Sequence, residues 1–217
     1  MPNLRQQLET PSVPSLPVPP ITYSALFQSQ NNGVLRTFFI KLVNAVSSLL
    51  GPRGGKYLNN PYGAFQDSTD QSASNTTTAY PITFNTTDFS NGVTLSNSSR
   101  LNVLDTGIYN IQFSIQFKNT TNDGQDVDIW FRKNGTNIAN SNSRFFLPAR
   151  KSTGDPSHLI AAMNFFVNLQ ASDYIELVWC TTDIGVSIEQ YGTATNPTRP
   201  TTPSAIVTVS FVSNLSV

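Results

Sequence analysis

Few side chains in this sequence are of the types that carry out acid–base, nucleophilic or metal chemistry. The chain of 217 residues has one histidine, His158, and one cysteine, Cys180. A catalytic triad or a zinc site needs several such groups together, and no second histidine or cysteine accompanies them. We therefore expect His158 to be a surface or strand-start residue and Cys180 to be a small buried apolar residue. The protein is predicted to have no catalytic site, no cofactor and no enzymatic activity.

Three aspartates around a predicted turn form a second candidate site. They are Asp123, Asp126 and Asp128. Oxygen atoms of such carboxylates are the ligands that calcium requires. Their spacing matches no calcium-binding loop, so we predict no metal site and keep a calcium ion as the alternative.

The composition excludes several classes of partner. Only 12% of the residues are charged and the formal net charge is zero, so there is no basic excess to bind nucleic acid or an anionic membrane. No apolar run is long enough to insert into a membrane. A single cysteine cannot form an intrachain disulfide, and residues 1–8 have no apolar signal core, so we expect folding in a reducing cytoplasm. Neutral amides and hydroxyls dominate the polar residues, which suits contact with other proteins or sugars.

The segment from Gly107 to Lys118 is the clearest structural element. From Tyr109 to Phe117 every second residue is apolar, and the residues between them are polar and uncharged. Side chains alternate between the two faces of a strand, so this pattern predicts a central strand with one buried and one solvated face. Three of its five inward residues are aromatic, which indicates packing against a second sheet.

Strand patterns recur at short intervals from residue 63 to the end, without a helix among them. This arrangement predicts an all-β, two-sheet sandwich of jelly-roll type as a head domain over residues 63–217. Asn134-Gly135 carries the signal of a two-residue hairpin turn. Polar loops are expected at 119–125, 148–157 and 192–204. The predicted strands are 63–67, 79–84, 93–95, 99–104, 107–118, 126–133, 136–140, 158–169, 174–181, 186–190 and 205–214.

A proline-rich segment occupies much of residues 1–32, which we predict to be an extended anchoring arm. Proline fixes φ and withholds a backbone donor, which excludes helix. Aliphatic residues alternate with the prolines, so we interpret the segment as an arm that lies along another protein, with a disordered tail as the alternative. The residues predicted to anchor the protein to a particle are Pro11, Val13, Pro14, Leu16, Pro17 and Val18.

A helix is predicted over residues 33–50, within a stalk and hinge segment of residues 33–62. Apolar residues recur at spacings of four and three, the a/d pattern of a coiled coil. Gly51-Pro52 is expected to end the helix. A helix of this length is marginal alone in water, so it packs either on the β-domain or on copies of itself. The stripe predicted to join three copies is Leu35, Phe39, Leu42, Val46 and Leu49.

Several segments resemble the jelly-roll heads of the C1q/TNF-like family. The segments that carry the resemblance are 107–113, 128–135, 173–177 and 209–211. The first is similar to a Gly-x-Tyr-x-Phe-type strand, with Ile111 where an aromatic residue is usual. The second is similar to a hairpin that ends in Lys-Asn-Gly, and Ser172 replaces a glycine before the third. The resemblance covers roughly residues 63–215 and implies a homotrimer of jelly rolls with an apolar axis and the amino-terminal segments gathered at its base.

Segments 31–39, 55–58 and 61–65 resemble small virion structural proteins of tailed bacteriophages, particularly marine ones. This resemblance implies a location in the virion, assembly in the bacterial host cytoplasm, and other capsid or tail proteins as partners. Secreted C1q-like proteins usually carry a signal peptide and a collagen-like stalk, and neither pattern occurs in this sequence.

Two classes of function follow. In the first, the protein is a homotrimeric capsid-decoration or short-fibre module that its arm and helix attach to the particle. In the alternative, it is the head of a tail fibre that contacts a host surface glycan or protein. Loops 119–125 and 148–157 contain no aromatic residue, which favours the structural role.

Overall fold

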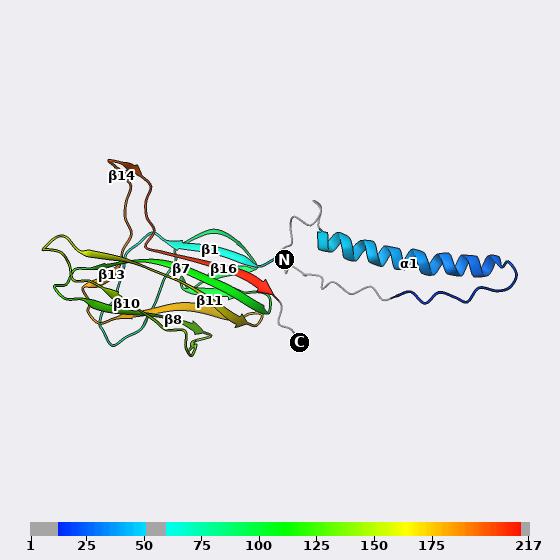
Figure 1. The fold of residues 1–217 in the computed structure, drawn as a ribbon, viewed down its shortest axis with the longest axis horizontal. Helices are drawn as coiled ribbons and strands as arrows, with labels where there is room; N and C mark the ends of the chain where they lie inside the picture. Colours follow the sequence, from blue (N-terminus) through cyan, green and yellow to red (C-terminus); the bar gives the residue numbers. More distant parts are fainter. Residues whose placement is uncertain (1–12, 51–59, 214–217) are drawn as a thin grey trace. The chain divides into compact units, whose positions relative to one another are not determined.

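Figure 1 shows the computed structural model, which describes residues 13–50 and 60–213, without the side chains of residues 48–50. The chain divides into two compact units, one that ends at Asn59 and one that begins at Asn60. The predicted head domain begins at residue 63, close to this boundary. The predicted arm and the stalk segment as far as Asn59 belong to the first unit, whereas residues 60–62 of the predicted stalk belong to the second, where Tyr62 begins β1.

The first unit contains one helix, α1 (Ala25–Leu50). The Ser24 hydroxyl accepts a hydrogen bond from the Phe27 N–H at 3.2 Å, which makes Ser24 the N-cap. The prediction of an extended arm is therefore wrong for residues 25–32, which are helical. This part of the helix contains amides and leads into an Asn-Asn-Gly sequence, which is typical of turns, so the apolar pattern did not reveal it. The helix is described as far as Leu50, and Gly51-Pro52, the residues predicted to end it, lie outside the described residues.

The second unit is built from two seven-stranded sheets and one small hairpin, β14 (Ala194–Thr195) with β15 (Thr198–Arg199), which projects from the sheets (Figure 1). Sheet A contains β1 (Tyr62–Asp67), β2 (Gln71–Ser72), β4 (Thr86–Asn91), β7 (Gly107–Asn119), β11 (Ser157–Leu169), β13 (Val186–Ile188) and β16 (Ala205–Ser213). Sheet B contains β3 (Tyr80–Pro81), β5 (Val93–Ser96), β6 (Arg100–Val103), β8 (Gln125–Lys133), β9 (Thr136–Asn137), β10 (Ser143–Leu147) and β12 (Tyr174–Thr181).

Strand β7 is central in sheet A. It pairs with β11 along one edge and with β16 and β13 along the other, and β16 leads through β1 to β4. Sheet B has the order β10-β8-β12-β6-β5, with β3 on β12 and β9 on β8. Every ladder in the two sheets is antiparallel, which confirms the predicted all-β class.

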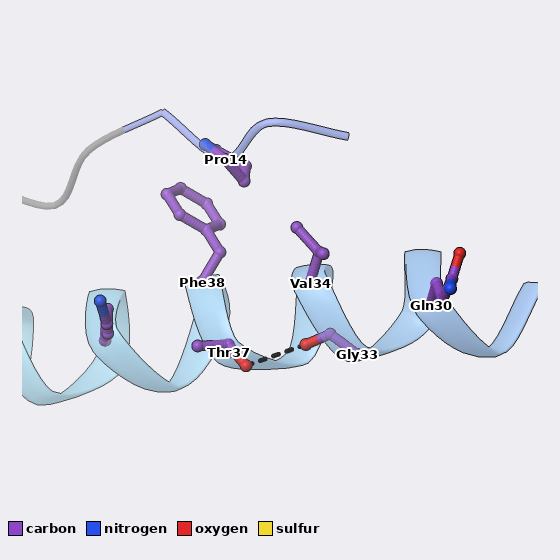
Figure 2. Close-up of a pocket in the computed structure, with 7 residues that line it drawn as sticks. Pro14, Gln30, Gly33, Val34, Thr37 and Phe38 are labelled. Carbon is purple, nitrogen blue, oxygen red and sulfur yellow. Dashed lines mark hydrogen bonds between the residues drawn. The ribbon is translucent and has the colours of Figure 1, made fainter. Parts of the chain in front are cut away.

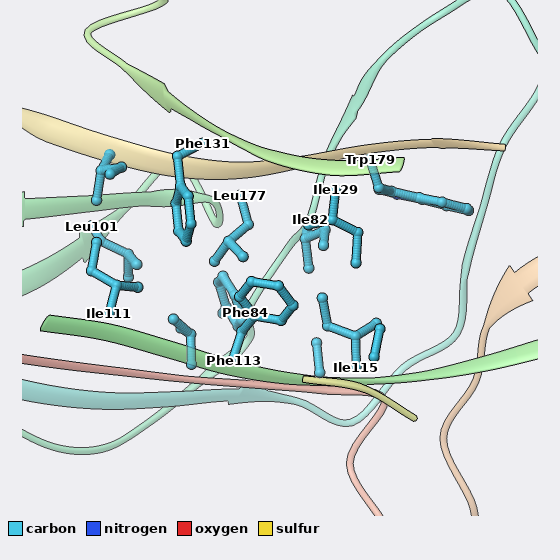
Figure 3. Packing of buried hydrophobic residues seen from close by; sticks show 14 of the residues in the cluster. Ile82, Phe84, Leu101, Ile111, Phe113, Ile115, Ile129, Phe131, Leu177 and Trp179 are labelled. Carbon is cyan, nitrogen blue, oxygen red and sulfur yellow. The ribbon is translucent and has the colours of Figure 1, made fainter. Parts of the chain in front are cut away.

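The core lies between the two sheets, and β7 supplies its predicted apolar face. The alternate side chains from Tyr109 to Phe117 are all buried. Phe113 packs edge-on against Phe131 of β8 with ring centroids 6.1 Å apart (Figure 3). The ring centroids of Phe117 and Trp179 of β12 lie 5.6 Å apart. The register predicted for this strand is therefore confirmed.

The predicted turn at Asn134-Gly135 is also confirmed, since both residues have positive φ, 48° and 81°, as a type I′ turn requires. Strands β2, β4, β10, β14 and β15 were not predicted. The side chains of β4 are exposed or nearly so, and strands this polar or this short carry little periodic signal. The predicted loop at 192–204 contains the β14–β15 hairpin.

Candidate functional site

The outer face of sheet A is uncharged over most of its area. The outward positions of β11 face those of β7 and β16 in continuous rows, such as Phe166–Asn110–Ser210 and Ala162–Ser114–Ile206. Charged or titratable side chains of these three strands, Lys118 and His158, lie together at one end. The large apolar side chains exposed on these three strands are Ile160, Phe166, Ile206 and Val212.

Strand β11 is the edge of sheet A, and it carries apolar side chains on both faces, with Ile160, Ala162 and Phe166 outward among Asn164 and Asn168. Among the described residues its only ladder is with β7. Residues 159–169 contain no charged residue, histidine or proline, although native edge strands usually carry such residues to prevent pairing with other chains. The inward side chains of Leu159, Met163 and Phe165 are only partly buried. This strand has the composition of one that is covered on both faces.

Asn110 adds a polar feature to the same face. Its side-chain oxygen is buried, and no donor of the described residues reaches it. A buried acceptor without a partner costs about 1–3 kcal/mol, so Asn110 is a locally unfavourable position on this face.

The outer face of sheet B has the opposite character. Its outward positions carry six charged side chains: Arg100, Asp126, Asp128, Arg132, Arg144 and Glu176. Arg144 binds Asp128 with Nη2 2.9 Å from Oδ2, and Arg100 Nε lies 3.5 Å from an oxygen of the buried Glu176. The hydrogen bond from Arg144 holds the pKa of Asp128 below its ordinary value.

The three predicted aspartates do not act together. The Asp128 carboxylate is held by Arg144 and Asn142, and the Asp123 carbonyl accepts a hydrogen bond from Asn119 at 2.9 Å. Within the described parts of the chain, no group of three or more His, Cys, Asp or Glu side chains is placed to hold a metal ion. The structure therefore offers no support for the calcium alternative.

His158 is exposed near the start of β11, as predicted, and it has a partner that the sequence did not reveal. Its Nδ1 lies 2.7 Å from the Tyr191 hydroxyl. Burial, together with the nearby Glu189, raises the pKa of Tyr191. The Tyr191 backbone pairs with Thr202 at the base of the β14–β15 hairpin, so this contact ties the hairpin to β11. No local spacing could have indicated it, because the two residues are far apart in sequence.

Cys180 corrects a prediction. It is only half-buried and lies on the outer face of sheet B, because its neighbours Trp179 and Thr181 occupy the inward positions of β12. Burial raises the pKa of its thiol. The prediction assumed that a cysteine in an apolar strand faces the core.

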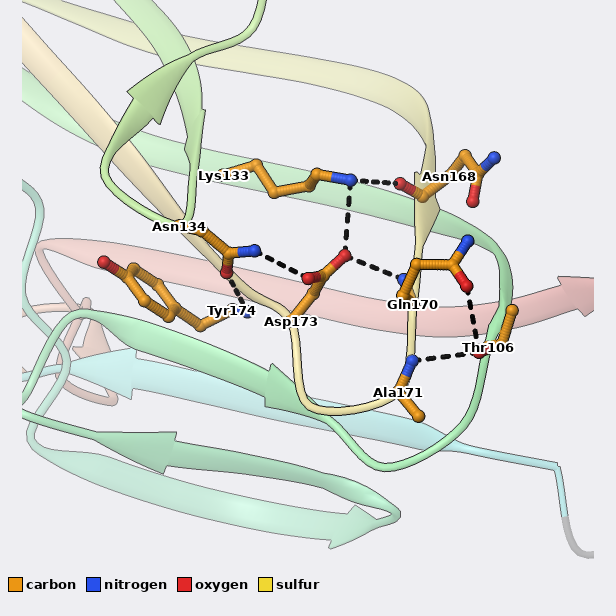
Figure 4. Close-up of polar contacts among 8 residues, drawn as sticks. All are labelled: Thr106, Lys133, Asn134, Asn168, Gln170, Ala171, Asp173 and Tyr174. Carbon is orange, nitrogen blue, oxygen red and sulfur yellow. Dashed lines mark hydrogen bonds and ion pairs between the residues drawn. The ribbon is translucent and has the colours of Figure 1, made fainter.

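A polar network joins three turns at the end of the sandwich where β7 begins (Figure 4). The Asp173 carboxylate accepts hydrogen bonds from Asn134 at 2.6 Å and from the Gln170 N–H at 2.8 Å, and Lys133 lies 3.2 Å away. Burial pushes the pKa of Asp173 upward, but these donors outweigh it and the pKa lies below its ordinary value. Thr106 links the β6–β7 turn to Ala171 at 2.9 Å. These groups bind one another, so the network stabilises the three turns and does not form a ligand site.

In the first unit, the predicted anchoring residues divide into two sets. Pro14 lines a groove with Val34 and Phe38 of α1 (Figure 2). Pro17 is half-buried. The aliphatic residues that were predicted to anchor the protein together with these prolines are exposed: Val13, Leu16 and Val18. Pro11 lies outside the described residues.

The predicted helix stripe is not buried within its own unit. Phe39 and Val46 are exposed, and Leu35 and Leu42 are half-buried. The Leu49 side chain lies outside the described residues. Ile40 and Val43 are exposed as well, so α1 carries a broad apolar surface. Within the described residues, no helix is long and apolar enough to span a membrane.

A scan against models of protein families finds no match to this sequence, and a search of curated proteins finds none either.

Proposed function

We propose that the protein is a homotrimeric virion structural protein of a tailed bacteriophage, a capsid-decoration or short-fibre module with a jelly-roll head. Its arm and helix attach it to other capsid or tail proteins. The family and the virion location rest on the sequence resemblance. The mode of assembly rests on the surface of sheet A.

The strand order supports a jelly roll. Consecutive long strands pass from sheet A to sheet B and back: β7 lies in sheet A, β8 and β10 in sheet B, β11 in sheet A, and β12 in sheet B. A jelly roll is an antiparallel double sheet in which Greek-key connections produce this kind of exchange.

The observation that carries the self-association is the character of β11 and the face beside it. An exposed edge strand without charge or proline, with large apolar side chains on both faces, is an aggregation site unless another molecule covers it. A second copy is the natural occupant, because an uncharged face can meet its own counterpart without like-charge repulsion. Closed symmetry then limits assembly to a ring, and the resemblance implies three members.

The exposed aliphatic residues of the arm support a role in anchoring. Val13, Leu16 and Val18 stay uncovered while Pro14 lies against the helix. A proline-rich arm loses less conformational entropy on docking than a flexible one, and three arms on one trimer bind with avidity.

Light scattering of the purified protein tests the assembly. We expect a mass near three times 23.7 kDa. A clean monomer at micromolar concentration would contradict both the trimer and the fibre module.

Deletion of residues 1–22 tests the anchor and leaves the Ser24 N-cap in place. We expect a folded, soluble trimer that no longer joins the particle. A full-length variant with Val13, Leu16 and Val18 changed to serine should fail in the same way, whereas Pro14→Ala should attach more nearly like the wild type. Normal occupancy of the truncated protein on virions would place the attachment in the helix or the head.

A further inference from the structure

The outer face of sheet B exposes one large apolar side chain among its polar groups, Phe146 of β10. Its side chain is 63% exposed, and no other strand of sheet B exposes a large apolar residue within the described chain. The tip of its ring packs against Gly124, where an added Cβ would clash with the ring. Phe146 is therefore an aromatic ring seated on backbone and open to solvent.

A carboxylate that accepts no hydrogen bond from the described residues lies beside this ring, within electrostatic reach of Arg144. Phe146 and Asp126 are direct partners in the β10–β8 ladder, so their side chains share one face with Cβ atoms about 5 Å apart. The Asp126 backbone is fixed by Thr182, whose hydroxyl accepts from the Asp126 N–H at 3.0 Å. No donor of the described residues reaches the Asp126 carboxylate, which leaves its oxygens free to accept hydrogen bonds.

A guanidinium group completes the patch. Arg144 lies two positions before Phe146 on the same face of β10. Asp128 holds it through two contacts, Nε–Oδ1 at 3.1 Å and Nη2–Oδ2 at 2.9 Å. A guanidinium has five N–H donors, so this pairing orients Arg144 and leaves other donors available to a ligand.

The loop beneath the ring is already formed. Asn119 is fully buried, and its amide donates to the carbonyls of Asp123 and Pro148, both at 2.9 Å. Its oxygen accepts from the Thr121 N–H at 2.8 Å. Because these bonds hold the loop that carries Gly124, a ligand need not order it, and a preformed site binds more tightly for this reason.

We propose that Phe146, Asp126 and Arg144 bind a neutral sugar ring of a glycan. The C–H face of a sugar stacks on an aromatic ring, while its hydroxyls donate to a carboxylate and accept from a guanidinium. A protein partner would need a larger apolar area, such as the four residues exposed on β11 and β16 of sheet A. This site is separate from the structural role and does not depend on the mode of attachment.

The test is binding of the purified full-length protein to a printed array of oligosaccharides that covers neutral hexoses, N-acetylhexosamines and deoxyhexoses. The strongest ligand is then titrated by calorimetry against the variants. We expect wild-type binding, and we expect Phe146→Ala and Asp126→Asn each to raise Kd by about tenfold or more. Phe89→Ala on sheet A is the matched control, since Phe89 is 60% exposed, and it should leave Kd unchanged.

Two outcomes would overturn the proposal. One is a wild-type protein that binds no glycan on the array, or whose Kd is the same in the Phe146→Ala variant. The other is a Phe146→Ala variant that changes the mass in light scattering, because Phe146 would then belong to a subunit interface. Loss of glycan binding alone leaves the mass unchanged, so this result and the failure of the proposed trimer are distinguishable.

Discussion

The two sheets of this protein both contribute to one core but present unlike surfaces to the outside. Sheet A exposes Ile160, Phe166, Ile206 and Val212 on a face whose central rows carry no charge. Sheet B exposes one large apolar residue, Phe146, among six outward positions with charged side chains. In both sheets the side chains alternate between inward and outward positions. The sheets therefore differ only in which residues occupy the outward positions.

The comparison indicates which face is built to be covered. A charge taken out of water costs several kcal/mol unless it is paired, so a face destined for an interface avoids charge. A face that stays in water gains solubility from charge and tolerates weak ion pairs such as Arg144–Asp128. We infer that sheet A meets other copies and that sheet B faces solvent and its ligands.

The largest expected effect comes from a charge placed on sheet A. Phe166→Asp should abolish assembly, because the carboxylate would have to be buried without a partner, and light scattering should report the monomer mass. Phe146→Asp is the matched control on sheet B, since the two phenylalanines are 56% and 63% exposed. Dissociation by Phe146→Asp alone would reverse the assignment of the two faces.

The second effect separates the inner and outer sides of sheet A. Phe113→Ala should lower the free energy of unfolding by about 3–5 kcal/mol, because it removes a ring from a close-packed core. Gln112→Ala, on the exposed side of the same strand, should change it little. Both are measured by urea unfolding at equal protomer concentration, and equal losses would mean that the register is wrong.

A titration distinguishes charge that stabilises the fold from charge that only faces solvent. The folded-state pKa of Asp173 is lowered. Its stabilisation is therefore complete above the unfolded value of about 3.9 and is lost as pH falls through the folded pKa. Asp173→Asn should cost about 1 kcal/mol at neutral pH. The difference from wild type should shrink below about pH 4, and a constant difference at all pH values would contradict this account.

The smallest effect concerns the ion pairs of sheet B. Arg144→Gln should leave the midpoint of thermal unfolding within about 2 °C of the wild type, because exposed ion pairs contribute little. Differential scanning calorimetry measures this midpoint. A large drop would show that the charges of sheet B stabilise the fold, and the contrast between the faces would then lose its basis.

The sequence alone determined the features that depend on neighbouring residues. The alternation from Tyr109 to Phe117 set the register of β7, and Asn134-Gly135 set a hairpin turn. Each of these signals is local, because side-chain direction and backbone φ follow from the residue and its immediate neighbours. The start of α1 was predicted wrongly for the same reason. Ser24 caps the helix there, although the residues that follow it have little apolar periodicity.

Only the tertiary structure decided which strands lie at an edge and which side chains meet across strands. The contact of His158 with Tyr191 and the pairing of Phe146 with Asp126 join residues that are far apart in the chain. The edge position of β11 likewise depends on how distant strands pair. Period-two patterning tells which face of a strand is apolar, but it does not tell which strand lies beside it. Cys180 shows the same limit, since its place on the outer face depended on which neighbours the opposing sheet buried.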